Sequence, residues 1–335
     1  MREPSVSCVI PTLNSARTLE ACLSSIRMQE YPGDLEIVLV DAGSTDATLD
    51  IARRHGVDQV LDNPLTTGEA GKARGLRAAR GEIVCFVDSD NFLVGVDWLA
   101  RMVAPFRDSD VVSAEPLRWA YRRSDGYVDR YCALTGVNDP ASLFVGNYGR
   151  YSHLTGRWTG FPAETRKADG YIRVRVDPEL LPTMGANGYL VRAEALRGIV
   201  TSDFLFDIDA VGELARAGFE VVARVDTAIG HSFARGYGDF VRKTRRRARD
   251  YLYYSGLGSR TYPWARYRWG LVRFALFTVL TVPLLVQAAT GYARRPDAAW
   301  LFHPVACWAT LVVYASEVLR AQFRQERHGR REWRQ

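Results

Sequence analysis

The sequence predicts an α/β fold in which a mostly parallel sheet is covered by helices on both faces. Residues 6–10, 35–40 and 82–87 are short, continuous apolar runs of the kind that form buried parallel strands. Residues 16–28 repeat apolar side chains at helical spacing, and residues 69–80 form a second expected helix before the third strand. The 335 residues are 47% apolar and 24% charged, which excludes a disordered or fibrous protein.

The charge is divided unevenly along the chain. The net charge of +6 would by itself suggest a nucleic-acid partner. Residues 235–335, however, carry 19 Lys and Arg against 6 Asp and Glu, a net +13, which leaves −7 for residues 1–234. An acidic body is therefore followed by a strongly basic tail, and we expect no nucleic-acid partner.

Two uncharged runs in the tail predict a transmembrane hairpin. Residues 274–293 would span roughly 30 Å as a helix, which is the thickness of a bilayer core, and residues 298–316 form a similar run. A pair of buried core helices is the alternative. Both outer flanks are richer in Arg than the connector, which places the body and the C-terminus in the cytoplasm, although Arg294 and Arg295 in the connector oppose this.

Ahead of the hairpin, residues 239–255 place apolar side chains on one helical face and basic ones mostly on the other. This pattern is typical of a helix on an anionic membrane surface, with a solvated charged helix as the alternative. We expect a multi-pass protein of the cell membrane whose catalytic domain lies on the cytoplasmic face. The predicted parts are a catalytic domain at 1–234, a basic interfacial segment at 235–268, a transmembrane hairpin at 269–319 and a basic cytoplasmic tail at 320–335.

The start of the chain and its cysteines fit a cytoplasmic location. The first strand begins within six residues, so we expect no N-terminal signal peptide. The five cysteines are scattered without a CxxC pair, which fits a reducing compartment.

Polar clusters follow three of the predicted strands, at residues 11–14, 41–44 and 88–90. Ligands of parallel α/β sheets bind beyond the carboxyl ends of the strands, although each cluster could also be turn chemistry alone. Neither a dinucleotide fingerprint nor a P-loop is present. Asp88 and Asp90 must be paired, solvated or bound to a metal, and Mg²⁺ or Mn²⁺ would prefer such oxygens.

Four segments together resemble the inverting family-2 glycosyltransferases, which have the GT-A fold. They occur in the family's order and cover roughly residues 5–235. The segments are Val-Ile-Pro-Thr-Leu-Asn at 9–14, Val-Asp-Ala-Gly-Ser-Thr-Asp at 40–46, Ala-Arg-Gly-Glu-Ile-Val-Cys-Phe-Val-Asp-Ser-Asp at 79–90, and Phe-Asp-Ile-Asp followed by Leu-Ala-Arg-Ala-Gly-Phe at 206–219.

The resemblance implies a site for a nucleotide sugar and a divalent metal, Mn²⁺ or Mg²⁺. Thr12 and Asp41 would contact the base and ribose, and Lys72 would lie near the sugar nucleotide. Asp90 would bind the metal, with Asp88 close to the ribose or sugar. The implied nucleotide-sugar contacts are Pro11, Thr12, Asn14, Asp41, Lys72, Asp88 and Ser89, and the implied metal ligands are Asp90, Asp88 and His231. His231 could equally be a hydrogen-bonded surface histidine.

The resemblance also implies a catalytic base and an acceptor-side loop. Asp207 occupies the position of the base, with Asp209 as the rival, and Phe206 stands where the family often has Glu. Ala42 replaces a second Asp that is common in its motif. The acceptor-side loop would include Gly185, Asn187 and Gly188.

The expected reaction transfers a sugar from a UDP-sugar, or else a GDP-sugar, to a hydroxyl of a lipid-linked or other membrane-associated glycan. Anionic membrane lipids are expected partners. The alternative acceptor is polyprenyl phosphate, which needs no base, so Asp207 favours the hydroxyl. A non-catalytic membrane adaptor is the contrasting class. The aromatic-rich stretch at 114–182 could stack on sugars, meet the bilayer or simply pack locally.

Overall fold

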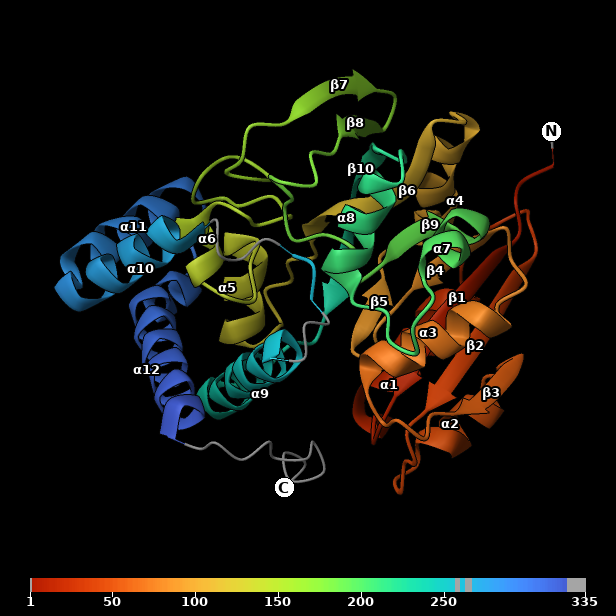
Figure 1. The fold of residues 1–335 in the computed structure, drawn as a ribbon, viewed down its shortest axis with the longest axis horizontal. Coiled ribbons are helices and arrows are strands. Elements are labelled where there is room, and N and C mark those ends of the chain that lie inside the picture. The colour runs from red at the N-terminus through yellow and green to blue at the C-terminus, as the bar shows by residue number, and fades with distance from the viewer. Residues whose placement is uncertain (1, 257–259, 263–266, 324–335) are drawn as a thin grey trace. The chain divides into compact units, whose positions relative to one another are not determined.

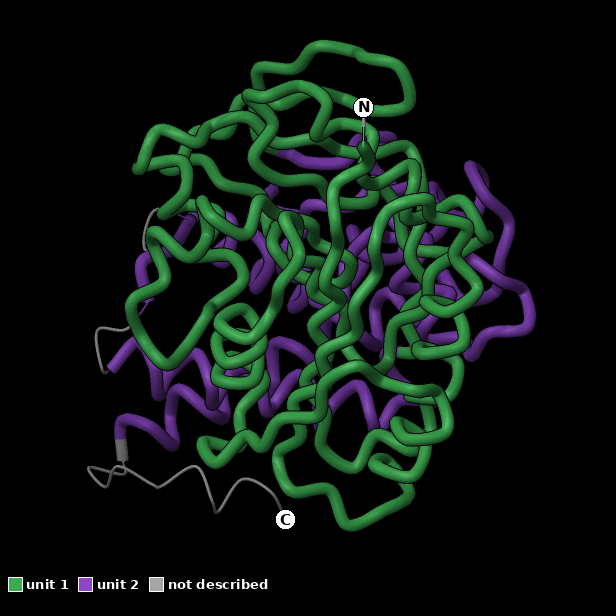
Figure 2. Tube along the Cα trace, turned by 90° about the vertical axis from the view of Figure 1, so that its right-hand side faces the viewer, with its two compact units in different colours: residues 1–120, 161–232 green, residues 121–160, 233–335 purple. Residues whose placement is uncertain are grey.

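The computed structural model of the chain describes residues 2–256, 260–262 and 267–323. The chain forms two compact units, each built from two separate stretches of sequence (Figure 2). Unit 1 comprises Met1–Ala120 and Phe161–Ser232, and unit 2 comprises Tyr121–Gly160 and Phe233–Gln335.

Unit 1 is a mixed sheet with flanking helices (Figure 1). Along the sheet the strands follow the order β3-β2-β1-β4-β9-β6-β10-β8-β7, and β5 pairs with β10. The strands are β1 (Val6–Thr12), β2 (Leu35–Asp41), β3 (Gln59–Asp62), β4 (Ile83–Phe86), β5 (Asn91–Leu93), β6 (Val111–Trp119), β7 (Glu164–Ala168), β8 (Tyr171–Arg175), β9 (Tyr189–Arg192) and β10 (Val221–His231).

The α/β fold predicted from the sequence is confirmed, and the sheet is mixed: within the described residues four strand pairs, β6–β10 among them, are parallel and five are antiparallel. The run β3-β2-β1-β4 is parallel throughout, as the apolar runs predicted. Beyond it, β9 lies antiparallel between β4 and β6, and the β7–β8 hairpin adds two antiparallel strands beside β10. The directions of the strands beyond β4 depend on pairing between distant parts of the chain, which a run of apolar residues does not predict.

Helices flank the sheet of unit 1. They are α1 (Ala16–Arg27), α2 (Thr48–Arg54), α3 (Gly68–Ala78), α4 (Trp98–Val103), the 3₁₀ turn η1 (Ala104–Arg107), α7 (Ala193–Ile199) and α8 (Asp207–Arg216). Two glycines let α3 lie close to β1. A Cβ atom on Gly71 would lie 2.9 Å from that of Pro11, and one on Gly75 would clash with Val9. This close packing fixes the position of Lys72, the neighbour of Gly71.

The sheet of unit 1 encloses a buried ion pair. Arg224 of β10 has no exposed side-chain surface and donates a hydrogen bond to Glu115 of β6, whose side chain is 2% exposed. Each charge offsets the cost of burying the other.

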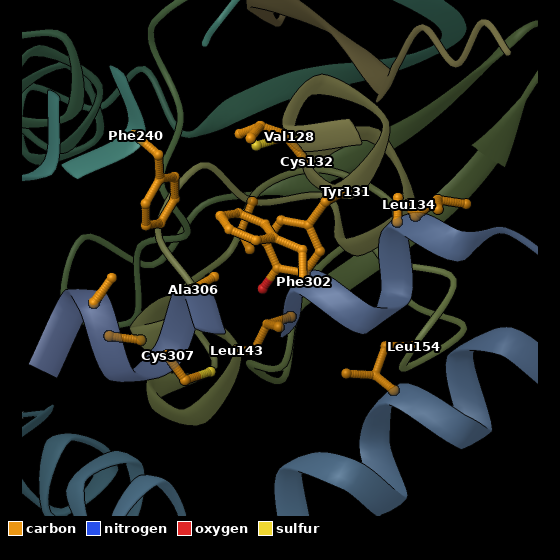
Figure 3. Packing of buried hydrophobic residues seen from close by; sticks show 14 of the residues in the cluster. Val128, Tyr131, Cys132, Leu134, Leu143, Leu154, Phe240, Phe302, Ala306 and Cys307 are labelled. Carbon is orange, nitrogen blue, oxygen red and sulfur yellow. The ribbon is translucent and has the colours of Figure 1, made fainter. Parts of the chain in front are cut away.

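Unit 2 is helical. It contains α5 (Tyr127–Thr135), α6 (Ala141–Val145), α9 (Tyr237–Gly256), α10 (Arg268–Leu280), α11 (Val282–Arg294), the 3₁₀ turn η3 (Ala298–Leu301) and α12 (Phe302–Phe323). Its core gathers aromatic and aliphatic side chains from both stretches of sequence (Figure 3). The ring of Phe302 lies edge-on to those of Tyr131 and Phe240, with centroids 5.3 Å away in each case.

Residues 121–160 therefore pack with the C-terminal helices, whereas the sequence-based division placed them inside a domain ending at residue 234. Tyr131, Phe144 and Tyr148 in this stretch are buried. For these three aromatic residues, the local-packing alternative is the one the structure supports.

The first predicted membrane span is not one straight helix. Within 274–293 the chain turns by 94° between α10 and α11, at Thr281, which has a φ of 59°. Pro283 lies in the first turn of α11, where its missing N–H is harmless. Among the described residues one helix, Ala298–Gln322, is long and apolar enough to cross a bilayer, with a mean hydropathy of 1.4 and half of its apolar window buried. The two-span hairpin is thus not confirmed.

The predicted basic helix exists as α9, but several of its cations are bound within unit 2. Arg245 and Arg249 pair with Glu317 of α12, and Lys243 and Arg247 lie over the ring of Phe233. Of the predicted cytoplasmic tail, residues 324–335 lie outside the described part of the chain.

Candidate active site

The first polar cluster is organised by the carboxylate of Asp41 at the end of β2. Asp41 is paired with Thr12 in the register of the two strands and is 5% exposed. Its Oδ1 accepts hydrogen bonds from the hydroxyls of Thr12, at 3.0 Å, and of Ser44. Its Oδ2 accepts the backbone N–H groups of Gly43 and Ser44, at 3.0 and 2.7 Å. A carboxylate has about four acceptor positions, so Asp41 is fully used in shaping this loop.

The loops after β1, β2 and β4 are tied to one another. Asn14, in a left-handed conformation with a φ of 49°, donates its backbone N–H to the hydroxyl of Ser44 at 2.8 Å and accepts the N–H of Thr45 at 2.9 Å. The hydroxyls of Ser15 and Ser89 lie 2.8 Å apart. The predicted residues Pro11, Thr12, Asn14, Asp41 and Ser89 therefore lie in one connected edge of the sheet.

Lys72 lies between two of the predicted site carboxylates. Its Nζ is 2.9 and 2.8 Å from the two carboxylate oxygens of Asp207, and 3.3 Å from Oδ1 of Asp88. Lys72 is 5% exposed. Burial opposes the charge on its ammonium group, but Asp207 and Asp88 outweigh this effect and raise the pKa of Lys72 above its usual range.

Asp207 is the first residue of α8, where the N-terminal end of the helix favours a negative charge. Burial raises the pKa of Asp207 to about 6; the ammonium group of Lys72 opposes the rise and the carboxylate of Asp88 adds to it. The side chain keeps 23% of its surface exposed, so a substrate can reach it. Asp209, the rival base, is 4% exposed in the same helical turn.

The glycine-rich segment ahead of β9 approaches Asp207 closely. Gly185 has a φ of +103°, and any Cβ atom there would clash with the carbonyl of Asp207. Asn187 also has a positive φ, of 59°, and the N–H of Gly188 bonds the carbonyl of Phe86 at 2.8 Å. The predicted acceptor-side loop is thereby positioned against the backbone of the predicted base.

Asp90 and His231 come together from different parts of unit 1. Oδ1 of Asp90 is 3.4 Å from Nε2 of His231, and the backbone of Asp90 accepts the N–H of Ser232. Within the described residues no three His, Cys, Asp or Glu side chains are close enough to hold a metal ion unaided. One carboxylate oxygen and one imidazole nitrogen nevertheless form a donor pair that suits Mn²⁺ or Mg²⁺ when substrate phosphates supply further ligands.

Three neighbours of the site were not predicted from the sequence. Ser15 and Ser44 connect the loops through their hydroxyls. The ring of Trp119 lies 4.8 Å from that of His231. Ser44 stands inside a quoted motif and could have been found there, whereas the position of Trp119 at the end of β6 carries no sequence signal for contact with a residue on β10.

Comparison with known proteins identifies the family of this chain. The family model for glycosyl transferase family 2 matches residues 7–133. A PGL/p-HBAD biosynthesis glycosyltransferase of Mycobacterium tuberculosis is 42% identical over 109 residues, which are 31% of this chain and 42% of that protein. An N-acetylglucosaminyltransferase of Bradyrhizobium elkanii is 31% identical over 134 residues, 38% of this chain and 73% of that protein. The match thus covers less than half of the mycobacterial relative.

A solved structure shares the fold over most of the chain. The mannosyltransferase PcManGT from Pyrobaculum calidifontis, in complex with GDP-Man and Mn²⁺, is 19% identical, with a TM-score of 0.54 over 95% of this chain and 88% of that one. The chain belongs to glycosyl transferase family 2.

Proposed function

We propose that the chain is a metal-dependent, inverting glycosyltransferase that moves a sugar from a nucleotide sugar to a hydroxyl of a membrane-associated, lipid-linked glycan. The observation that carries this proposal is the contact of the buried Lys72 with the partly exposed carboxylates of Asp207 and Asp88. It joins a carboxylate of raised pKa to the Asp-Ser-Asp segment, where the donor diphosphate is expected. A general base needs such a pKa and such access to solvent.

In the proposed reaction, the acceptor hydroxyl attacks the anomeric carbon of the donor sugar. Its proton passes to the carboxylate of Asp207, a new carbon–oxygen bond forms, and the bond from the anomeric carbon to the diphosphate breaks. The bonding electrons leave with the nucleoside diphosphate. Because attack and departure occur on opposite faces of one carbon, a single displacement inverts its configuration.

Lys72 has two tasks in this scheme. Before the substrates bind, its ammonium group keeps Asp207 ionised and fixed in position through the two hydrogen bonds to the carboxylate. When a donor is bound, the same cation faces Asp88, next to the expected diphosphate. Asp90 and His231 would hold a divalent cation, which when bound supplies charge stabilisation for the leaving diphosphate.

The remaining assignments follow from place in the fold. The loop organised by Asp41, together with Pro11, Thr12, Asn14 and Ser89, would bind the nucleotide. The segment containing Gly185, Asn187 and Gly188 would face the acceptor, because it packs against the backbone of Asp207. Unit 2 would hold the enzyme at the cytoplasmic face of the cell membrane. A two-span hairpin and a one-sided attachment both satisfy that role.

Two other functions make different predictions. A polyprenyl phosphate acceptor is already ionised, so transfer to it would survive replacement of Asp207. A non-catalytic adaptor would neither transfer sugar nor hydrolyse a donor. The accessible side chain of Asp207 and its raised pKa favour the hydroxyl acceptor.

The test uses the purified full chain with UDP-, GDP- and dTDP-sugars, Mn²⁺ or Mg²⁺, and either native membrane lipid or polyprenyl phosphate. We expect transfer to native lipid, with inverted anomeric configuration by NMR, and a fall of roughly 10²–10⁴-fold in Asp207→Asn. Asp203→Asn is the matched control, because Asp203 is an exposed carboxylate that pairs with Arg77. Transfer that persists in Asp207→Asn would refute the assigned base, and absence of transfer from every donor would refute the enzyme.

A further inference from the structure

The helices of unit 2 expose an apolar stripe that its core does not use. Leu301, Val305, Trp308, Val312 and Leu319 recur at helical spacing along η3 and α12, and each is 39–75% exposed. Other sides of α12 pack against α9, α10, α11 and α5, and Trp308 of the stripe donates its indole N–H to the hydroxyl of Thr281 at 3.0 Å. An apolar stripe of this length on one side of a helix marks an interaction surface.

Both ends of α12 contact the same charged helix. Near its start, the ring of Phe302 packs on Phe240 of α9, with centroids 5.3 Å apart. Near its end, Glu317 pairs with Arg249 of α9 at 2.9 Å. Between residues 239 and 250, α9 carries eight charged side chains, which cannot lie in hydrocarbon beside α12. The two ends of α12 are therefore on the same side of any bilayer that the stripe contacts.

Both ends of the pair α10–α11 contact the same stretch of unit 2, residues 144–154. At the start of α10, Gly270 lies so close to α6 that a Cβ atom added to it would be 2.5 Å from the Cα of Val145. Arg273, one turn later, donates a hydrogen bond to the carbonyl of Phe144. At the end of α11, Arg294 donates to the carbonyl of Leu154. Both ends of the bent pair are thus held by the stretch 144–154, which favours a pair that enters one leaflet over a helix that crosses the bilayer.

The bend between α10 and α11 is apolar, and the outer ends of the two helices are basic. Val279, Leu280 and Val282 flank Thr281 and are 62, 55 and 65% exposed. No charged residue occurs from 274 to 293. Exposed arginines stand at the outer ends, at positions 268, 273 and 294, and Trp269 beside them is 72% exposed. Each arm has 13 residues, or roughly 20 Å of helix, which is shorter than the roughly 30 Å hydrocarbon core.

We propose that unit 2 docks on a single leaflet of an anionic phospholipid bilayer, with the α10–α11 bend among the acyl chains and α12 lying along the interface. A lipid surface fits better than a protein partner because the bend carries no charge and the arginines are confined to the two outer ends of the helix pair. The uncharged bend matches acyl chains, and the arginines at its ends match lipid phosphates. This attachment replaces the predicted two-span hairpin and does not depend on the transfer reaction.

The decisive test asks on which side of the membrane two positions lie. Arg246→Cys on α9 and Pro296→Cys in the connector after α11 are both at exposed positions, whereas the five native cysteines are buried. Each full-length variant is treated with a membrane-impermeant maleimide in intact spheroplasts and in sealed inverted vesicles, with the parent chain as background. We expect both cysteines to react only in the inverted vesicles. Reaction of the two cysteines from opposite faces would overturn the proposal in favour of the hairpin.

A second measurement tests the bend. In co-sedimentation with vesicles of phosphatidylglycerol and phosphatidylethanolamine, we expect Val279→Asp to bind at least about tenfold more weakly than the parent chain. Val96→Asp is the matched control, because Val96 is an exposed valine of unit 1. Circular dichroism checks that both variants are folded. Equal binding by Val279→Asp and the parent, or a parent chain that self-associates without binding vesicles, would also overturn the proposal. Neither result would bear on the transferase reaction.

Discussion

Both carboxylate oxygens of Asp207 accept hydrogen bonds from the ammonium group of Lys72, although the two residues are 135 positions apart in sequence. The contact depends on the close packing of α3 on β1 at Gly71 and on the start of α8 at Asp207. Lys72 is the cation that opposes the raised pKa of Asp207, whereas burial and the carboxylates of Asp88 and Glu69 raise it. The protonation of the proposed base is therefore tied to one lysine.

This relationship predicts a specific pH dependence. The base acts when deprotonated, so kcat/KM should fall as the pH drops below about 6, the pKa of Asp207 in the free enzyme. Lys72→Met removes the opposing cation while burial remains, so the pKa rises and the acidic limb moves to higher pH. Lys72→Arg keeps the charge and should shift the limb less. The measurement is kcat/KM against pH for the three proteins.

The position of the acidic limb separates this role from a loss of donor binding. If Lys72 only bound the donor, Lys72→Met would lower kcat/KM equally at every pH and leave the limb in place. A limb that moves to lower pH in Lys72→Met would contradict the electrostatic account.

The strand-end clusters were predictable because the carboxyl ends of parallel strands meet at one edge of a sheet. The adjacency of Thr12 and Asp41 follows from that rule, and the structure places them as partners in the β1–β2 register. The pairing of Lys72 with Asp207 was not predictable in the same way. Each residue was assigned to the site by resemblance, but helical periodicity does not say which side chains of α3 and α8 will meet.

The helical unit was harder to predict for a related reason. An uncharged run from 274 to 293 is compatible with one straight transmembrane helix and equally with two helices that meet at a bend at Thr281. From the sequence alone, the basic residues of α9 could bind lipid phosphates or a carboxylate of the protein. In the structure, Arg245 and Arg249 pair with the buried Glu317. Only the three-dimensional partners distinguish these alternatives, and those partners lie far away in the sequence.

The carboxylate of Asp41 provides a test of loop structure against nucleotide contact. Asp41→Ala removes the acceptors of the N–H groups of Gly43 and Ser44, which are at least partly open to water, so it should destabilise the protein by about 0.5–1.5 kcal/mol for each hydrogen bond lost. Asp41→Asn can turn its amide so that the oxygen accepts both N–H groups and the nitrogen donates to the hydroxyls of Thr12 and Ser44. Thermal unfolding of the two variants measures the difference.

Nucleotide affinity then distinguishes the two roles of Asp41. If Asp41 acts by shaping the loop, Asp41→Asn should keep the Kd for UDP or GDP within about threefold of the parent value. A much weaker Kd at unchanged thermal stability would instead indicate that the carboxylate itself binds the nucleotide. Isothermal titration calorimetry provides the measurement.

Glu317 is expected to stabilise unit 2. It is 4% exposed and pairs with Arg245, Arg249 and Arg320, whose side chains remain 41, 32 and 54% exposed. Glu317→Gln leaves three cations without their counter-charge, and because the cations keep contact with water we expect a loss of roughly 1–3 kcal/mol. Unfolding in lipid-containing detergent micelles measures it, with Asp169→Asn at an exposed position of unit 1 as the control. An unchanged melting temperature would show that the arginines find other partners.

The last prediction concerns the metal. Removal of divalent cations with EDTA should abolish transfer, and Mn²⁺ or Mg²⁺ should restore it, because the diphosphate leaving group needs charge stabilisation. His231 and Asp90 lie 3.4 Å apart and are the proposed protein ligands. His231→Ala should therefore raise the Mn²⁺ concentration needed for half-maximal activity by roughly tenfold or more, and Asp90→Ala should do so at least as strongly.

A shift in metal requirement is a sharper test than a loss of activity. His55→Gln is the matched control, because His55 pairs with Glu20, outside the proposed metal pair. Direct Mn²⁺ binding, followed by electron paramagnetic resonance in the presence of UDP, should weaken in the His231 variant and not in the control.

The structural reason is the number of ligands that the protein offers to the metal. Two protein ligands leave most of the coordination shell to the diphosphate, so Mn²⁺ should bind weakly without UDP and much more tightly with it. Strong Mn²⁺ binding without nucleotide that His231→Ala leaves unchanged would mean that the cation is held elsewhere.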